Sequence, residues 1–180
     1  MNFKKYNLFF RTVEMQDAEF IYTLRTNKAL SQYLNKVSGN LEDQKKWITA
    51  YKQREMSGEE YYFVSYNADG EKFGLNRIYN LLNNSFEIGS WIYKKTADDA
   101  IPILGDLAVR DFGFNLLNRK FSFCTFKVSK NNLKVLKYHK MFGPVLIKED
   151  DEEYHFKLSG ENFEKQKNRL LKILNDGKSS

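Results

Sequence analysis

Residues 60–95 constrain the fold of this chain more than any other stretch. They read EYYFVSYNADGEKFGLNRIYNLLNNSFEIGSWIYKK, in which β-branched and aromatic residues are interrupted by two turn-forming segments, NADG and LNNS. This pattern predicts three antiparallel strands over residues 61–66, 72–80 and 85–93, joined by short turns. The fold must therefore contain a three-stranded antiparallel meander.

Helical segments precede this meander. A strand predicted over residues 8–13 is followed by apolar residues at helical spacing in residues 15–27, where Asp17 is suited to cap the start of the helix. The same spacing recurs in residues 41–55. Two helices are therefore expected between the first strand and the meander.

Further elements follow the meander. Helical spacing returns over residues 100–116, and residues 120–128 form a strand with little polar alternation, as expected of a central strand. A helix over residues 131–144 comes next, and residues 144–149 and 153–158 form a last strand pair around the acidic segment EDDEE. These acids are expected at a solvated hairpin tip.

The helix over residues 131–144 raises a question about function. Asn131 or Asn132 is suited to cap its start, and Gly143 ends it. Tyr138 and His139 lie side by side on its apolar arc, opposite a face of lysines. An inward-facing Tyr or His is more often a packing residue than a catalytic one, so the helix alone leaves both roles open.

Size and composition narrow the class of protein. A chain of 180 residues is expected to form one domain, and its 42% apolar residues are sufficient for a sizeable core. No apolar stretch approaches the length that crosses a bilayer, so a soluble, cytoplasmic protein without a membrane partner is expected. The C-terminal residues 161–180 are expected to form a short amphipathic helix and a polar tail.

Charge and cysteine content narrow the choice of partners. The net charge of +6 favours an anionic small ligand. The dispersed lysines give no nucleic-acid-binding motif, so a nucleic-acid partner is not expected. Cys124 is the only cysteine and is expected to be a small core residue. With only two histidines besides, no metal site is expected.

The order of elements and two motifs carry a family resemblance. The motifs are FEIGSWI, residues 86–92, and NLKVLKYHKMFG, residues 132–143. Together they resemble the GCN5-related N-acetyltransferase (GNAT) superfamily over about residues 8–163, in particular its ribosomal-protein and aminosugar-nucleotide acetyltransferase branch. The resemblance implies a single α/β domain over residues 1–180. Its mixed, mostly antiparallel sheet of about seven strands would be splayed between the fourth and fifth strands and flanked by helices.

The resemblance also implies acetyl-CoA as the co-substrate. By motif, the backbone of Ser90, Trp91 and Ile92 would hydrogen-bond the pantetheine arm, as a peptide pairs with a strand edge. The pyrophosphate would lie at the start of the next helix, near Ile101. The motif asparagine Asn132 is also implied as a cofactor-binding residue. The loop implied for the pyrophosphate comprises Lys94, Lys95, Thr96, Ala97, Asp98, Asp99 and Ala100.

This loop departs from the family pattern. The family usually has glycines there, whereas this chain reads KKTADDAIP and brings two carboxylates to the expected phosphate position. Three interpretations follow: CoA bound through a differently shaped loop, CoA bound weakly, or a fold that has lost the cofactor. The last would make the chain a non-catalytic binding module.

Direct transfer of an acetyl group needs a neutral amine and a proton donor for the departing thiolate. The family commonly places a Tyr seven residues after the motif asparagine; that position is His139 here, whereas residue type favours Tyr138. Glu87 is the candidate base, acting directly or through a water molecule. The structural alternative is that its carboxylate caps a neighbouring amide or pairs with Arg77.

The implied acceptor is a primary amine. An aminosugar nucleotide is favoured over a protein N-terminus, and whether two copies form a homodimer stays open. Four side chains from the first helices and the meander are candidates to line the acceptor site: Arg25, Tyr33, Trp47 and Tyr79.

Overall fold

The computed structural model describes residues 1–37, 39–116 and 121–176. Within them, one sheet contains eight strands in the order β1-β2-β3-β4-β5-β6-β8-β7. The strands are β1 (Asn2–Lys5), β2 (Leu8–Thr12), β3 (Tyr61–Tyr66), β4 (Lys72–Tyr79), β5 (Ser85–Tyr93), β6 (Phe123–Ser129), β7 (Val145–Glu149) and β8 (Glu153–Ser159). Only β5 and β6 are parallel neighbours; the other pairs are antiparallel. The predicted α/β fold with a mixed, mostly antiparallel sheet is confirmed.

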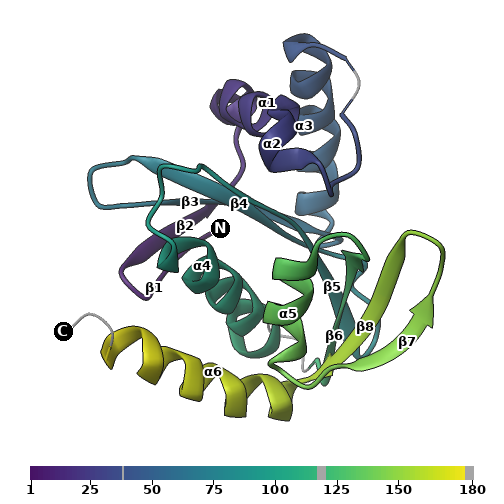
Figure 1. Cartoon of the computed structure of the whole chain (residues 1–180). Coiled ribbons are helices and arrows are strands. Elements are labelled where there is room, and N and C mark those ends of the chain that lie inside the picture. The colour runs from purple at the N-terminus through teal and green to yellow at the C-terminus, as the bar shows by residue number, and fades with distance from the viewer. Residues whose placement is uncertain (38, 117–120, 177–180) are drawn as a thin grey trace.

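Helices cover both faces of this sheet (Figure 1). They are α1 (Ala18–Thr26), α2 (Lys28–Ser31), α3 (Leu41–Met56), α4 (Ala100–Asp111), α5 (Leu133–Lys140) and α6 (Gly160–Asp176), with 3-10 turn η1 (Met15–Asp17) and π-helical turn η2 (Phe112–Leu116). One apolar cluster packs α1 and α3 against β3, β4 and β5. A larger cluster packs α4, α5 and α6 against the opposite face. The sheet therefore separates two cores.

The sheet has one strand more than the seven predicted, because residues 2–5 form β1. A hairpin turn joins it to β2, in which Tyr6 and Asn7 both have positive φ, 52° and 61°. Two consecutive residues with positive φ match the twist of a two-residue hairpin, usually with glycine in at least one position. No glycine marks this turn in the sequence, so the strand was not predicted.

Helix starts follow the local side chains. Asn40 caps α3, since its side-chain oxygen accepts hydrogen bonds from the amides of Glu42 and Asp43. Asn132 caps α5 by accepting from Val135, which confirms one of the two predicted caps. Asp17 was predicted to cap the first helix, but its side chain makes no cap bond to α1. Its carboxylate instead accepts from the Glu14 amide in the preceding turn.

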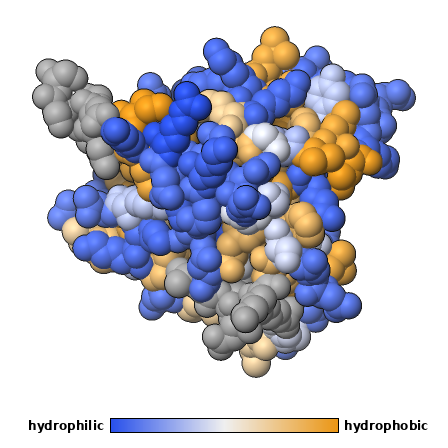
Figure 2. Space-filling view, turned by 90° about the horizontal axis from the view of Figure 1, so that it is seen from below, coloured by the Kyte–Doolittle hydropathy of each residue, from blue (hydrophilic) through white to orange (hydrophobic). Residues whose placement is uncertain are grey.

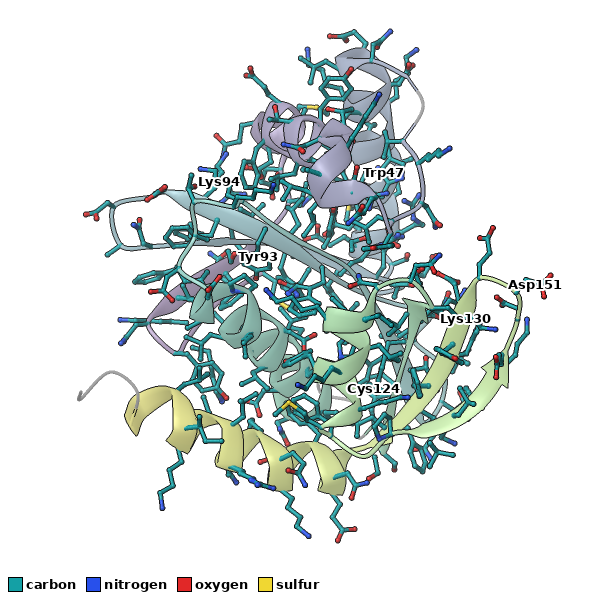
Figure 3. All side chains as sticks on the ribbon, in the orientation of Figure 1. Trp47, Tyr93, Lys94, Cys124, Lys130 and Asp151 are labelled. Carbon is teal, nitrogen blue, oxygen red and sulfur yellow. The ribbon has the colours of Figure 1, made fainter. Side chains whose placement is uncertain are left out.

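Helix α4 approaches the sheet closely at one point. A Cβ on Gly105 would lie 1.8 Å from the hydroxyl oxygen of Tyr93, whose ring reaches from β5 toward α4 (Figure 3). Only glycine allows this approach. The predicted helix over residues 100–116 is confirmed in position, although its last five residues form the π-helical turn η2 rather than α-helix.

Strands β5 and β6 separate along their length. Their backbone pairing runs only from Ser85 opposite Phe123 to Glu87 opposite Thr125. Beyond Glu87, β5 keeps its antiparallel partner β4, and no strand in the described part of the chain pairs with its other edge. The predicted splay of the sheet is therefore confirmed. Residue 120, included in the predicted central strand, lies outside the described residues.

The last strand pair forms the predicted hairpin, and Asp151 extends from its tip (Figure 3). The face viewed in Figure 2 is mostly hydrophilic, with separate apolar patches. Among the described residues, no helix is both long and apolar enough to cross a membrane. Residues 1–37, 39–116 and 121–176 likewise contain no group of His, Cys, Asp and Glu side chains arranged to hold a metal ion.

Candidate active site

A β-bulge marks the point where β5 leaves β6. Leu75 pairs with Ile92 and Arg77 pairs with Gly89, so one residue of β4 faces Ser90 and Trp91 of β5. Ser90 has φ of 51°, a left-handed conformation that non-glycine residues rarely adopt. Bulges and strained residues recur next to active sites because they redirect backbone groups. The bulge turns this part of β5 toward the opening between the strands.

A cavity of about 110 Å³ occupies that opening and is called here the β5–β6 cavity. Residues 88–91 of β5 and 126–129 of β6 form two of its walls. Helices α4 and α5 close it with Asp106, Asn132 and His139, among others. Predicted site residues Ser90, Trp91, Asn132 and His139 thus meet here, whereas Ile92 is buried in the core under α1 and α3.

A second cavity, of about 370 Å³, lies under α1 and α3 and is called here the helix-side cavity. Its wall includes Arg25, Lys36 and Trp47, and Figure 3 shows Trp47 on the α3 side of the sheet. Arg77 and Ser90 line both cavities. The two spaces therefore adjoin at the β-bulge.

The structure places three of the four predicted acceptor-site residues at these cavities. Arg25 and Trp47 line the helix-side cavity, and Tyr33 lines the β5–β6 cavity. Tyr79 lines neither cavity. Its hydroxyl group donates a 2.8 Å hydrogen bond to Glu87. Arg77, which sequence analysis treated only as a partner for Glu87, lines both.

In the loop over residues 94–100, the carboxylate of Asp98 binds the backbone at the start of α4. An Asp98 side-chain oxygen accepts a 2.8 Å hydrogen bond from the Ala100 amide, and its backbone oxygen accepts from Ile101 at 2.9 Å. Lys94 leans away from this helix start, with its ammonium 5.6 Å from the centre of the Phe20 ring on α1. At least two amides that a phosphate would use are therefore already bonded.

Glu87 lies apart from the other predicted catalytic residues. Its carboxylate accepts hydrogen bonds from the Tyr79 hydroxyl and from the Asn80 side-chain amide, at 2.8 and 2.9 Å. It lines neither of the two cavities. Arg77 pairs with Glu60 instead of Glu87. The structure therefore does not bring Glu87 together with Tyr138 and His139.

Tyr138 and His139 join a buried polar network with helix α4. The Tyr138 hydroxyl donates to Asp106 Oδ2 at 2.8 Å, and Arg110 Nε donates to the same oxygen at 2.8 Å. Arg110 Nη2 lies 3.0 Å from His139 Nδ1, and its Nη1 donates to Cys124 Sγ at 3.2 Å. Two residues of α5 are thus tied to one ion pair on α4.

Burial sets the protonation of this network. Burial and the Asp106 carboxylate raise the pKa of Tyr138 well above its usual value, so the phenol stays neutral. Burial and the Arg110 guanidinium hold the pKa of His139 well below its usual value, so the imidazole is neutral near pH 7. Burial also raises the pKa of Cys124 to about 11, consistent with a core thiol rather than a nucleophile.

Sequence analysis missed Asp106 and Arg110. They lie four residues apart on α4 with exposed fractions of 2% and 0%, inside an otherwise apolar segment. Charged residues are rarely buried unless they are paired. Two opposite charges four residues apart on an apolar helix face were therefore the sequence signal for a buried ion pair.

The comparisons with known proteins agree with this geometry. The sequence profile of the acetyltransferase (GNAT) domain family matches residues 7–143. No match was found among curated protein sequences.

Among solved structures, the apo form of FdhC, described as a nucleotide-linked sugar GNAT, is similar with 35% identity and a TM-score of 0.83. The match covers 95% of this chain and 97% of that one. Spermidine N-acetyltransferase from Vibrio cholerae, in complex with CoA and spermine, has 17% identity and a TM-score of 0.74 over 88% and 99% of the two chains. Ribosomal-protein-S5-alanine acetyltransferase from Vibrio fischeri has 15% identity and a TM-score of 0.73 over 91% and 98%.

The last two likenesses concern the fold alone. The family match spans most of the chain, and the likeness to FdhC spans nearly all of it. The β5–β6 splay and the bulge at Ser90 lie inside the matched region. The chain therefore belongs to the GNAT family of N-acetyltransferases.

Proposed function

We propose that this protein transfers an acetyl group from acetyl-CoA to the primary amine of a nucleotide-linked amino sugar. The observation that carries the proposal is the meeting of two cavities at Arg77 and Ser90. A transferase needs one space for each substrate and a point where the reacting groups meet. The β-bulge provides such a point.

The β5–β6 cavity suits the extended arm of CoA. Among the described residues, no strand pairs with the inner edge of β5 beyond Glu87, so its backbone groups could pair with the amides of a pantetheine arm. Ser90 and Trp91 would supply this edge, and Asn132 and His139 lie on the facing wall. The loop over residues 94–100 fits less well, because Asp98 already bonds the start of α4.

The helix-side cavity suits an anionic acceptor that carries an aromatic base. Among the described residues, Arg25 and Lys36 contribute two positive groups to its wall, and Arg77 a third that is paired with Glu60, against the carboxylate of Asp43. Guanidinium and ammonium groups bind the diphosphate of a nucleotide sugar. Trp47 adds aromatic surface to the wall, and its ring is held in place by stacking on Tyr51. A polycationic amine is disfavoured by the same charges. The likeness to FdhC, a nucleotide-linked sugar GNAT, supports the same acceptor class.

Acetyl transfer requires the protein to position the two substrates and to stabilise the charge that develops between them. Acetyl-CoA supplies a thioester, and the amine nitrogen loses a proton as the CoA sulfur gains one. His139 faces the β5–β6 cavity as a neutral imidazole and is our candidate donor to the reacting acyl group. Tyr138 donates its only proton to Asp106, so it would have to break that bond to act as the acid.

The acceptor assignment is tested by replacing Arg25 with alanine. A lost charged hydrogen bond to phosphate costs about 1.5–3 kcal/mol, so KM for a nucleotide-linked amino sugar should rise about tenfold or more. The KM for acetyl-CoA should not change. Steady-state release of the CoA thiol measures both constants.

Lys148→Ala is the matched control, because Lys148 is an exposed cation on β7 that lines neither cavity. It should leave both constants at the wild-type value. Efficient acetylation of spermidine or of a peptide N-terminus, with no turnover of the sugar nucleotide, would contradict the proposed acceptor.

A further inference from the structure

One ring nitrogen of His139 faces a group that can only donate hydrogen bonds. Arg110 Nη2 lies 3.0 Å from His139 Nδ1, and the Arg110 side chain is fully buried. A guanidinium has five N–H donors and no acceptor, and it stays protonated in proteins. Nδ1 must therefore accept this bond, which leaves no room for a proton on that nitrogen.

The other contacts of Arg110 hold the guanidinium in place. Its Nε donates to Asp106 and its Nη1 donates to Cys124, so three of its donors have fixed partners on three different elements. The Arg110 side chain therefore cannot turn away from His139 without leaving a buried carboxylate with fewer bonds.

The proton of the neutral His139 ring must consequently lie on Nε2. Among the described residues, no protein group forms a hydrogen bond with this nitrogen. The fully buried side-chain nitrogen and oxygen atoms without a hydrogen-bond partner in this part of the chain are Tyr6 Oη and Arg77 Nε, so His139 Nε2 is not fully buried. Nε2 is therefore still in contact with accessible space. Because His139 lines the β5–β6 cavity, its Nε2–H is a donor available to a ligand there.

The surrounding charges favour this form over a doubly protonated ring. The ionisable groups of the described residues that face His139 or its cavity come from five places: Asp106 and Arg110 on α4, Tyr138 on α5, Cys124 and Lys127 on β6, Arg77 on β4, and Tyr33 after α2. The Asp106 carboxylate is already shared between Arg110 and Tyr138. A second proton on His139 would point at a cation rather than at this carboxylate.

We infer that Arg110 is a positioning residue that holds His139 as its Nε2–H tautomer, so that a neutral imidazole donates to the acyl oxygen as negative charge develops there. The tautomer follows from contacts within the protein, whereas its use on an acyl group rests on the proposed function. A fixed donor aimed at developing charge needs no rearrangement during the reaction, which is why such groups are effective.

Nuclear magnetic resonance of the imidazole nitrogens tests the tautomer in the wild-type protein. The chain has two histidines, so the His155→Gln variant, altered on β8, identifies the His139 signals. With ¹⁵N-labelled histidine at pH 7, we expect a protonated Nε2 and an unprotonated Nδ1. A protonated Nδ1, alone or together with Nε2, would overturn the inference whatever the turnover.

Arg110→Lys tests the positioning role. Lysine keeps one positive charge but cannot reach three partners at once, so the His139 tautomers should mix. The kcat should fall about tenfold or more with KM for acetyl-CoA unchanged, by analogy with other residues that orient a catalytic histidine. His155→Gln should keep the wild-type rate. A folded Arg110→Lys variant with wild-type kcat would overturn the positioning role.

The two proposals fail in different ways. A wild-type protein with the Nε2–H tautomer but without acetyl transfer would refute the proposed function and the use of the donor, while the tautomer would stand. Acetyl transfer by a protein whose His139 carries its proton on Nδ1 would refute the inference and leave the proposed function intact.

Discussion

Replacing His139 with alanine is expected to lower kcat about 100- to 1,000-fold, the usual cost of removing one fixed donor to developing charge. Acetyl-CoA affinity should be retained, because under the proposed function the co-substrate would be held mainly by the β5 edge rather than by this ring. Steady-state kinetics give kcat, and calorimetric titration gives the affinity.

Tyr138→Phe is the matched comparison on the same helix. It removes only the hydroxyl group that donates to Asp106, and Arg110 still neutralises that carboxylate. We therefore expect a much smaller loss of kcat than for His139→Ala. The larger loss in Tyr138→Phe would instead identify the phenol as the acid, and wild-type rates in both variants would make the pair structural.

The second prediction with a large expected effect concerns the stability of the Asp106→Ala variant. Replacing Asp106 with alanine leaves the fully buried Arg110 guanidinium without its counter-charge, and it also removes the acceptor for Tyr138. Breaking one partner of a buried ion pair costs about 3–5 kcal/mol, so the free energy of unfolding should fall by that amount. Denaturant unfolding of the purified variant measures the change.

Lys45→Ala gives the contrasting case. Lys45 and Glu42 form an exposed ion pair of 2.7 Å on α3, and such pairs contribute at most about 1 kcal/mol. A loss for Asp106→Ala no larger than the loss for Lys45→Ala would show that the α4 ion pair is not the anchor of the network.

Much of the fold was predictable because local pattern and tertiary structure agree. The meander over residues 60–95 and the Asn132 cap depend on short-range periodicity and on side-chain bonds to nearby amides. Strand β1 escaped prediction because Tyr6 and Asn7 adopt positive φ without a glycine to signal it. Asp17 resembles a helix cap in sequence, but Arg11 and Lys72 bind its carboxylate from neighbouring strands.

The candidate site was predictable in part, and for a physical reason. The family resemblance places Ser90, Trp91 and His139 from their own motifs, and the structure brings all three to one cavity. The partners of His139 belong to another helix, so sequence spacing gives no distance between them. The bonds from Arg110 to His139 and from Asp106 to Tyr138 join residues 29 and 32 positions apart.

The reason for a glycine can also depend on contacts between strands, which the sequence alone does not show. From the sequence, Gly89 in FEIGSWI could be small to admit a ligand or could mark a β-bulge. The structure places it at the edge of the β4–β5 bulge, where a Cβ would also lie 3.1 Å from atoms of the Tyr79 side chain. That reason concerns a cross-strand partner, which becomes known only with the register of β4 and β5.

The measurement that tests the central claim most directly is calorimetric titration of the protein with acetyl-CoA. We predict saturable binding in the micromolar range for the wild type. Asp98→Ala, which frees the Ala100 amide and removes a negative charge, should bind several-fold more tightly, a gain of about 1 kcal/mol. Asp99→Ala makes the same charge change without freeing a cap bond and should show a smaller gain. No binding by any of the three proteins at millimolar acetyl-CoA would contradict the enzymatic account and indicate a non-catalytic module with an acetyltransferase fold.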